Sequence, residues 1–166
     1  MNMMLKMAVI IAVVVSLAGC GSTQSSQTGS TATSTSSVAT KTYPKDALNK
    51  AAYNGDVEEV AAILKTKPDP DNRDSSGGTA LHAAMFQKNI HIVEMLIDYG
   101  LDVNAIGPKN GYTPLHDAVW GNNPAAAKLL LEKGADPTIK NKEGQTPLEK
   151  AKSEGKEDLV EVLTGK

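Results

Sequence analysis

The chain has 166 residues, enough for one modest domain with appendages. Of its 17 basic and 19 acidic side chains, only Lys6 and Lys41 precede Tyr43, so the chain from Tyr43 onward has 15 basic against 19 acidic groups, a net charge of −4. This balance argues against nucleic acid as a partner, because phosphate binding needs a basic face. The single cysteine excludes an internal disulfide.

Residues 1–19 have the pattern of a secretory signal peptide. Lys6 precedes an apolar run, residues 7–15, which is shorter than the roughly 20 residues of a membrane-spanning helix. The run leads into Leu17-Ala18-Gly19-Cys20, which resembles a bacterial lipobox. That resemblance implies cleavage before Cys20 and acylation of its sulfur and new amino group by fatty acids such as palmitate. The alternative is an ordinary signal peptide followed by an incidental cysteine.

Residues 20–42 are predicted to be an acylated cysteine followed by a tether. Fourteen of the 22 residues from Gly21 to Thr42 are Ser or Thr, a composition that cannot bury enough apolar surface to fold. A flexible coil of this length spans about 25 Å root mean square. Gly21 stands where many Gram-negative lipoproteins have the aspartate that retains them in the inner membrane. We therefore expect a lipid-anchored protein of the bacterial cell envelope, on the periplasmic face of the outer membrane if the organism is Gram-negative.

The clearest helical pattern runs from Thr113 to Gly144. A capping hydroxyl at Thr113 followed by Pro114 predicts a helix start. The Gly-Asn-Asn-Pro stretch at residues 121–124 then ends this helix and starts a second one. Gly134 is predicted to end the second helix, since a glycine adopts a left-handed conformation there without steric cost. The stretch should therefore form two short antiparallel helices and a loop.

This pattern recurs at intervals of 33 or 34 residues. A leucine of the first helix recurs at Leu48, Leu81, Leu115 and Leu148, and a residue of the second helix recurs at Val60, Val93, Ala127 and Val160. One extra residue lies in the loop between Asp102 and Gly111, where insertions are tolerated. Four units are therefore predicted, at about 45–77, 78–111, 112–144 and 145–166.

The segment Thr113-Pro114-Leu115-His116-Asp117-Ala118 resembles the opening of an ankyrin repeat. The segment from Leu129 to Asp136 resembles the end of that family's second helix. The resemblance covers residues 43–166 and implies an all-α solenoid of four helix-turn-helix repeats joined by short hairpin-like loops. The outer repeats depart from the pattern: Asp46 is expected to cap the first helix, and Glu149 replaces the usual histidine in the last repeat.

The three histidines offer little chemistry. His82 and His116 occupy the ankyrin signature, and the resemblance implies that they bridge backbone groups of adjacent loops rather than bind a metal or catalyse a reaction. His91 and Glu94 are three residues apart and would share a helical face. Two such ligands are too few for zinc, so a solvated helix surface is favoured there.

The acidic loop before the second repeat is the remaining candidate for a metal. Asp69, Asp71 and Asp74 have the spacing of calcium ligands, but the required glycine and bidentate glutamate are absent at the right positions. The sequence also contains no nucleophile motif and no phosphate-binding loop. We therefore expect no enzyme activity, no metal, no cofactor and no small-molecule substrate, and a hydrolase is the least favoured alternative.

The aromatic residues give the strongest functional signal. Tyr53, Phe86 and Trp120 occupy one position in three successive repeats, although the chain has only six aromatic residues. In ankyrin proteins this end of the first helix lines the concave groove where partners bind, and Tyr112 belongs to a loop position that also faces partners. The same surface is predicted to include Gln87, Lys109 and Asn110. The alternative is that the aromatic side chains pack on one another and only cover the backbone.

The sequence therefore favours a non-catalytic module that binds another envelope protein through its concave groove. Two alternatives stay open, an inhibitor or immunity-type protein against an envelope enzyme or toxin, and a scaffold that stabilises an envelope enzyme in stress defence. The inhibitor predicts one tight partner, whereas the scaffold predicts weaker binding and a more stable partner.

Overall fold

The computed structural model describes residues 41–165. The predicted signal peptide, Cys20 and most of the predicted tether lie outside this range. Lys41, which the sequence placed in the tether, lies within it, and its Nζ is 2.8 Å from Glu59 Oε1 in the first repeat. No helix of the described part is both long and apolar enough to cross a membrane.

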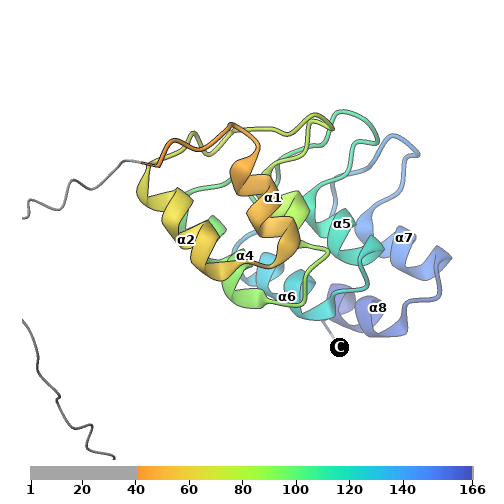
Figure 1. The fold of residues 1–166 in the computed structure, drawn as a ribbon. Helices are drawn as coiled ribbons and strands as arrows, with labels where there is room; N and C mark the ends of the chain where they lie inside the picture. Colours follow the sequence, from red (N-terminus) through yellow and green to blue (C-terminus); the bar gives the residue numbers. More distant parts are fainter. Residues whose placement is uncertain (1–40, 166) are drawn as a thin grey trace, which may run out of the picture. The chain divides into compact units, whose positions relative to one another are not determined.

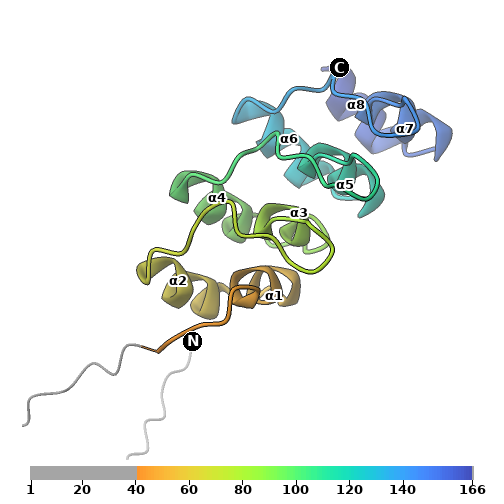
Figure 2. The ribbon, with the colours of Figure 1, turned by 90° about the horizontal axis from the view of Figure 1, so that it is seen from above.

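The described residues form eight helices, and consecutive helices pair in chain order (Figures 1 and 2). Their bounds are α1 (Ala47–Asn54), α2 (Val57–Lys65), α3 (Ala80–Ala84), α4 (Ile90–Tyr99), α5 (Pro114–Trp120), α6 (Pro124–Glu132), α7 (Pro147–Ser153) and α8 (Glu157–Thr164). Between residues 41 and 165, extended pairing is limited to one isolated bridge from Arg73 to Thr79. The predicted all-α solenoid of four helix pairs is confirmed.

The helices form two layers. The first helices of the pairs, α1, α3, α5 and α7, lie side by side in one layer, and the second helices, α2, α4, α6 and α8, form the other (Figure 2). Each helix therefore packs on its partner and on the equivalent helices of the neighbouring repeats. This is the arrangement of a solenoid, in which stability comes from contacts between neighbours.

One continuous apolar core runs between the layers. The residues that recur at the repeat interval are completely buried in the two central repeats, including Leu81, Val93, Leu115 and Leu130. The last repeat contributes less, since Leu159 is the only fully buried side chain of α8. The outer side of α8 is polar, as a terminal repeat requires.

Helix starts follow the sequence signals in three of the four repeats. Thr113 accepts a hydrogen bond from the amide of His116, and His116 Nδ1 accepts one from the amide of Thr113, which forms a capping box. Gly134 follows the end of α6 with φ of 91°, as predicted. The first repeat differs. Asp46 makes no capping hydrogen bond, because its φ of −90° and ψ of 5° are not the extended geometry of a capping residue, and its carboxylate instead pairs with Lys50 at 2.7 Å.

The histidine position of the repeat signature links neighbouring repeats. His82 Nε2 lies 3.2 Å from the carbonyl oxygen of Tyr112, and His116 Nε2 lies 3.0 Å from that of Gln145. In the first repeat, Asn49 Nδ2 donates to the carbonyl of Gly78 at 2.8 Å. Each of these side chains ties its helix to the loop that opens the next repeat, as the resemblance implied for the two histidines.

Candidate functional site

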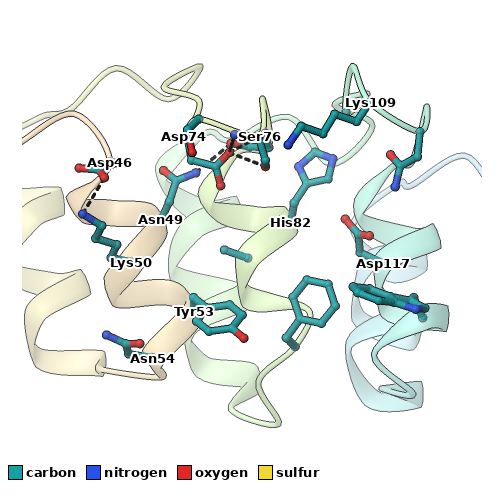
Figure 3. A pocket seen from close by; sticks show the side chains of 17 residues that line it. Asp46, Asn49, Lys50, Tyr53, Asn54, Asp74, Ser76, His82, Lys109 and Asp117 are labelled. Carbon is teal, nitrogen blue, oxygen red and sulfur yellow. Dashed lines mark hydrogen bonds and ion pairs between the residues drawn. The ribbon is translucent and has the colours of Figure 1, made fainter.

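A groove of about 650 Å³ runs along the first helices of the first three repeats (Figure 3). Its floor comes from α1, from α3 with the turn that follows it, and from α5. Its upper wall comes from the loops before α3 and α5, which contribute Asp74, Ser75, Ser76 and Gly78, and Gly107, Lys109 and Asn110. The repeat interval therefore creates the groove, because it places equivalent helix ends and loops next to one another.

An aromatic row crosses the floor of this groove. The rings of Tyr53 and Phe86 are 6.2 Å apart between centroids, and those of Phe86 and Trp120 are 5.0 Å apart with planes at 87°. Tyr53 and Trp120 nevertheless remain 57% and 59% exposed. The rings therefore contact one another, as the packing alternative expects, and still present free faces to the groove, as the binding alternative requires.

The backbone beneath the aromatic row is held by side chains of the following repeat. Gln87 Nε2 donates to the carbonyl of Tyr53, and Lys156 Nζ donates to those of Val119 at 2.6 Å and Trp120 at 3.0 Å. Asn123 Nδ2 likewise donates to the carbonyl of Gln87 at 2.6 Å. The aromatic side chains are therefore presented from a fixed backbone, which reduces the entropy lost when a partner binds.

Not all of the predicted binding residues meet in the groove. Lys109 and Asn110 line it together with Tyr53, Phe86 and Trp120. Tyr112 does not line it, and its ring stacks on His116 at 5.4 Å with Lys150 Nζ 5.1 Å from its centroid. Gln87 does not line it either, because its side chain is directed to the carbonyl of Tyr53. Tyr112 therefore does not join the aromatic row, and its contact with a partner stays a prediction.

The sequence did not single out Asp117, although it lines the groove. This carboxyl is only 8% exposed, and burial raises its pKa to about 7 against the opposing attraction of Lys150. Lys150 belongs to the next repeat, and its Nζ pairs with Glu154 Oε1 at 2.7 Å. A comparison of the repeats could have indicated this residue. The position after the histidine is Lys50, Ala83, Asp117 and Lys150 in the four repeats, and only the third repeat has an acidic residue there.

Comparison with known proteins decides the family. A family model described as ankyrin repeats in three copies matches residues 48–141. The chain belongs to the ankyrin repeat family. Ankyrin repeats are protein-interaction modules.

Relatives of this ankyrin chain occur in animals and bacteria. It is 35% identical over 125 residues to protein phosphatase 1 regulatory subunit 27 of Mus musculus, covering 74% of this chain and 80% of that protein. It is 35% identical over 119 residues to the ankyrin repeat protein YahD of Escherichia coli, covering 68% and 59%. Dauer abnormal formation protein 25 of Caenorhabditis elegans is 34% identical over 124 residues, covering 75% of this chain but only 32% of that protein. The chain thus spans about a third of the length of this last relative.

The titratable side chains of the ankyrin domain do not form a metal site within the described range. Residues 41–165 contain no group of three or more His, Cys, Asp or Glu side chains placed to hold a metal ion. Burial lowers the pKa of His82 and of His116, so both rings favour the neutral form that their hydrogen bonds require. His91 lies on the exposed surface of α4, with Nδ1 3.8 Å from Glu94 Oε2.

The acidic loop before α3 is organised by its own backbone. Asp69 Oδ1 accepts the amide of Asp71 at 3.0 Å, and Asp74 Oδ1 accepts the amides of Ser76 at 2.7 Å and Gly78 at 3.1 Å. These carboxylates close turns in the loop. Asp74 also belongs to the upper wall of the groove, together with Ser75, Ser76 and Gly78.

Proposed function

We propose that this chain is a non-catalytic binding module of the bacterial cell envelope, anchored through Cys20, which captures another envelope protein in its groove. The aromatic row carries this proposal. Tyr53 and Trp120 expose more than half of their surface next to Phe86, on a backbone that the following repeat fixes. Rigid aromatic side chains with one free face are typical of the anchors that dominate protein interfaces.

The anchoring part of the proposal rests on the N-terminal sequence. Leu17-Ala18-Gly19-Cys20 resembles a lipobox, and the Ser- and Thr-rich residues up to Thr42 would separate the lipid from the repeats. Two or more acyl chains hold a protein stably on a membrane, whereas one chain does not. The partner would therefore be a protein that is present at the same membrane or in the space next to it.

A partner that is itself an enzyme has specific support. The relative from Mus musculus that this chain covers to 80% is named as a regulatory subunit of a phosphatase. Both remaining alternatives, the inhibitor or immunity protein and the stabilising scaffold, are forms of enzyme regulation. An inhibitor would lower the activity of its partner, and a scaffold would lengthen the lifetime of its partner.

Site-specific photo-crosslinking in the native membrane tests the proposal. A photoreactive amino acid in place of Tyr53, in the groove, is expected to give a discrete protein adduct that mass spectrometry identifies. The matched control is the same amino acid in place of Lys128, which is exposed on α6 away from the groove. Trp120→Ala should abolish the adduct, since loss of a central aromatic anchor costs about 2 kcal/mol or more of binding free energy.

The opposite results would reject the groove as the binding surface. These are an adduct formed equally from position 128, or an adduct from position 53 that Trp120→Ala leaves unchanged. Circular dichroism of the Trp120→Ala protein provides the control for folding. Because Trp120 is 59% exposed, its removal leaves no core cavity and the helical signal should be retained.

A further inference from the structure

The groove contains one buried carboxylate that the described part of the chain does not neutralise. Asp117 is 8% exposed and lines the groove, and Figure 3 shows its side chain projecting from α5 below Lys109. Among residues 41–165, its side chain forms no ion pair and no hydrogen bond, and the charge of Lys150 is the one attraction that acts on it. A buried charge without a partner is costly, so such groups are normally paired or hydrogen-bonded.

Most of the other charged groups around the groove already have partners. The carboxylate of Asp46 pairs with Lys50 at 2.7 Å, and that of Asp74 accepts the amides of its own loop. Lys150, the cation that acts on Asp117 from the next repeat, pairs with Glu154 at 2.7 Å. Lys109 lines the upper wall and forms no ion pair within the described range, and it is not among the groups that shift the pKa of Asp117.

The surroundings of Asp117 suit a planar cation. Trp120 lies three residues after Asp117 on α5, and 59% of its surface is exposed. The ring centroids of Trp120 and Phe86 are 5.0 Å apart in an edge-on arrangement. A cation that approached the carboxylate of Asp117 would therefore also meet an aromatic face, which attracts positive charge. The groove lining has three acidic residues against two lysines, so its net charge becomes negative when a bound cation favours the ionised form of Asp117.

We propose that the groove recognises its protein partner through an arginine, whose guanidinium pairs with Asp117 and stacks on Trp120. This inference rests on the proposed function, because it assumes that the groove is the partner-binding surface. Arginine fits better than lysine, since its planar group binds carboxylates through two parallel hydrogen bonds and loses less hydration when it stacks on an aromatic ring.

The proposal also gives the unpaired carboxylate a role. In the free protein, burial opposes the ionisation of Asp117, and its raised pKa of about 7 reflects that cost. A guanidinium placed against the carboxylate would favour the charged form and remove the cost. The free energy that the fold loses by burying Asp117 would then be recovered only when the correct partner is bound.

Peptide titration of the full-length protein, in a mild nonionic detergent, tests this inference. The probe is acetyl-Gly-Arg-Gly-amide, and its control is the same peptide with citrulline, which keeps the shape of arginine and lacks the charge. Trp120 is the only tryptophan, so its fluorescence reports on the groove directly. We expect a saturable change in emission with the arginine peptide, a dissociation constant in the millimolar range, and binding at least about tenfold weaker for citrulline.

Two charge-matched variants make the test specific for Asp117. Asp117→Asn should abolish the response to the arginine peptide, because it removes the charge and keeps the shape of the side chain. Glu132→Gln removes one negative charge from the exposed surface of α6, outside the groove, and should leave the response unchanged. If both variants weaken binding equally, the peptide is attracted by net charge alone and the proposed pairing is wrong.

Other results separate this inference from the proposed function. Equal binding of the arginine and citrulline peptides, or no saturable response to either, would overturn arginine recognition. An adduct from position 53 that Trp120→Ala removes would still support the groove as the protein-binding surface in that case. Conversely, arginine-specific binding that Asp117→Asn abolishes supports this inference even before the natural partner is identified.

Discussion

The side chain at the histidine position of the repeat makes different hydrogen bonds in the first, central and last repeats. His82 and His116 each use one ring nitrogen to cap their own helix and the other to reach the carbonyl of the next loop. Glu149, in the last repeat, only caps its helix, through bonds from Thr146 of 2.8 and 3.0 Å. Asn49, in the first repeat, only reaches the next loop. A histidine is therefore present where both functions are needed, because its two ring nitrogens point in opposite directions.

At the same scale, Asp117 should make the stability of the domain depend on pH. The folded-state pKa of about 7 is above the ordinary value of 3.8, so the folded protein holds this proton where the unfolded chain has lost it. The free energy of unfolding should therefore fall as the pH rises from about 4 to about 7 and then level off.

We predict that Asp117→Asn removes this dependence and stabilises the protein at high pH. Each pKa unit corresponds to about 1.4 kcal/mol, so the gain in the free energy of unfolding should be about 3 kcal/mol larger at pH 8 than at pH 5. Chemical unfolding of both proteins at these two pH values measures it, and subtracting the wild type removes the contribution of the other titrating groups. An equal gain at both pH values would show that Asp117 titrates normally.

At the scale of the helix, much of the structure was predictable from local signals. Thr113, Pro114 and Gly134 fix where helices of the third repeat begin and end, and the repeat interval transfers the capping threonine to the second and fourth repeats. The prediction failed for Asp46, because capping depends on the backbone angles that the preceding turn imposes. The position of Tyr112 and the burial of Asp117 could not be predicted, because their surroundings include Lys150 of the next repeat, whose contacts the sequence does not show.

A pair of adjacent leucines in α6 tests how the helices are held. Leu130 is completely buried between the layers, whereas Leu131 is only partly buried. We predict that Leu130→Ala lowers the free energy of unfolding by about 2–5 kcal/mol, through lost apolar burial and the cavity left behind. Leu131→Ala removes the same atoms with the same change in helix propensity and should cost less than half as much. Thermal or urea unfolding measures both, and equal losses would contradict the assigned face of α6.

At the scale of the whole molecule, a small interface can be sufficient for binding if the groove and its partner are held at the same membrane. The groove spans the first three repeats and offers few anchors, which alone would give modest affinity. Anchoring at Cys20 through a tether of about 25 Å root-mean-square length would keep the repeats near the membrane and raise the effective concentration of a partner in the same membrane. This argument combines a described groove with a predicted anchor, and the anchor can be tested separately.

We predict that Cys20→Ser releases the protein from membranes or leaves it uncleaved, while the repeat fold is unchanged. The reason is that Cys20 is the only cysteine, so its loss would remove the predicted acylation site, and every core residue lies within the described residues 41–165. Membrane fractionation and labelling with radioactive palmitate measure the effect, and Ser22→Ala provides a control two residues away. Circular dichroism should show the same helical signal for both variants. If the Cys20→Ser protein still sediments with membranes in its processed form, another feature of the chain holds it there and the lipid anchor is wrong.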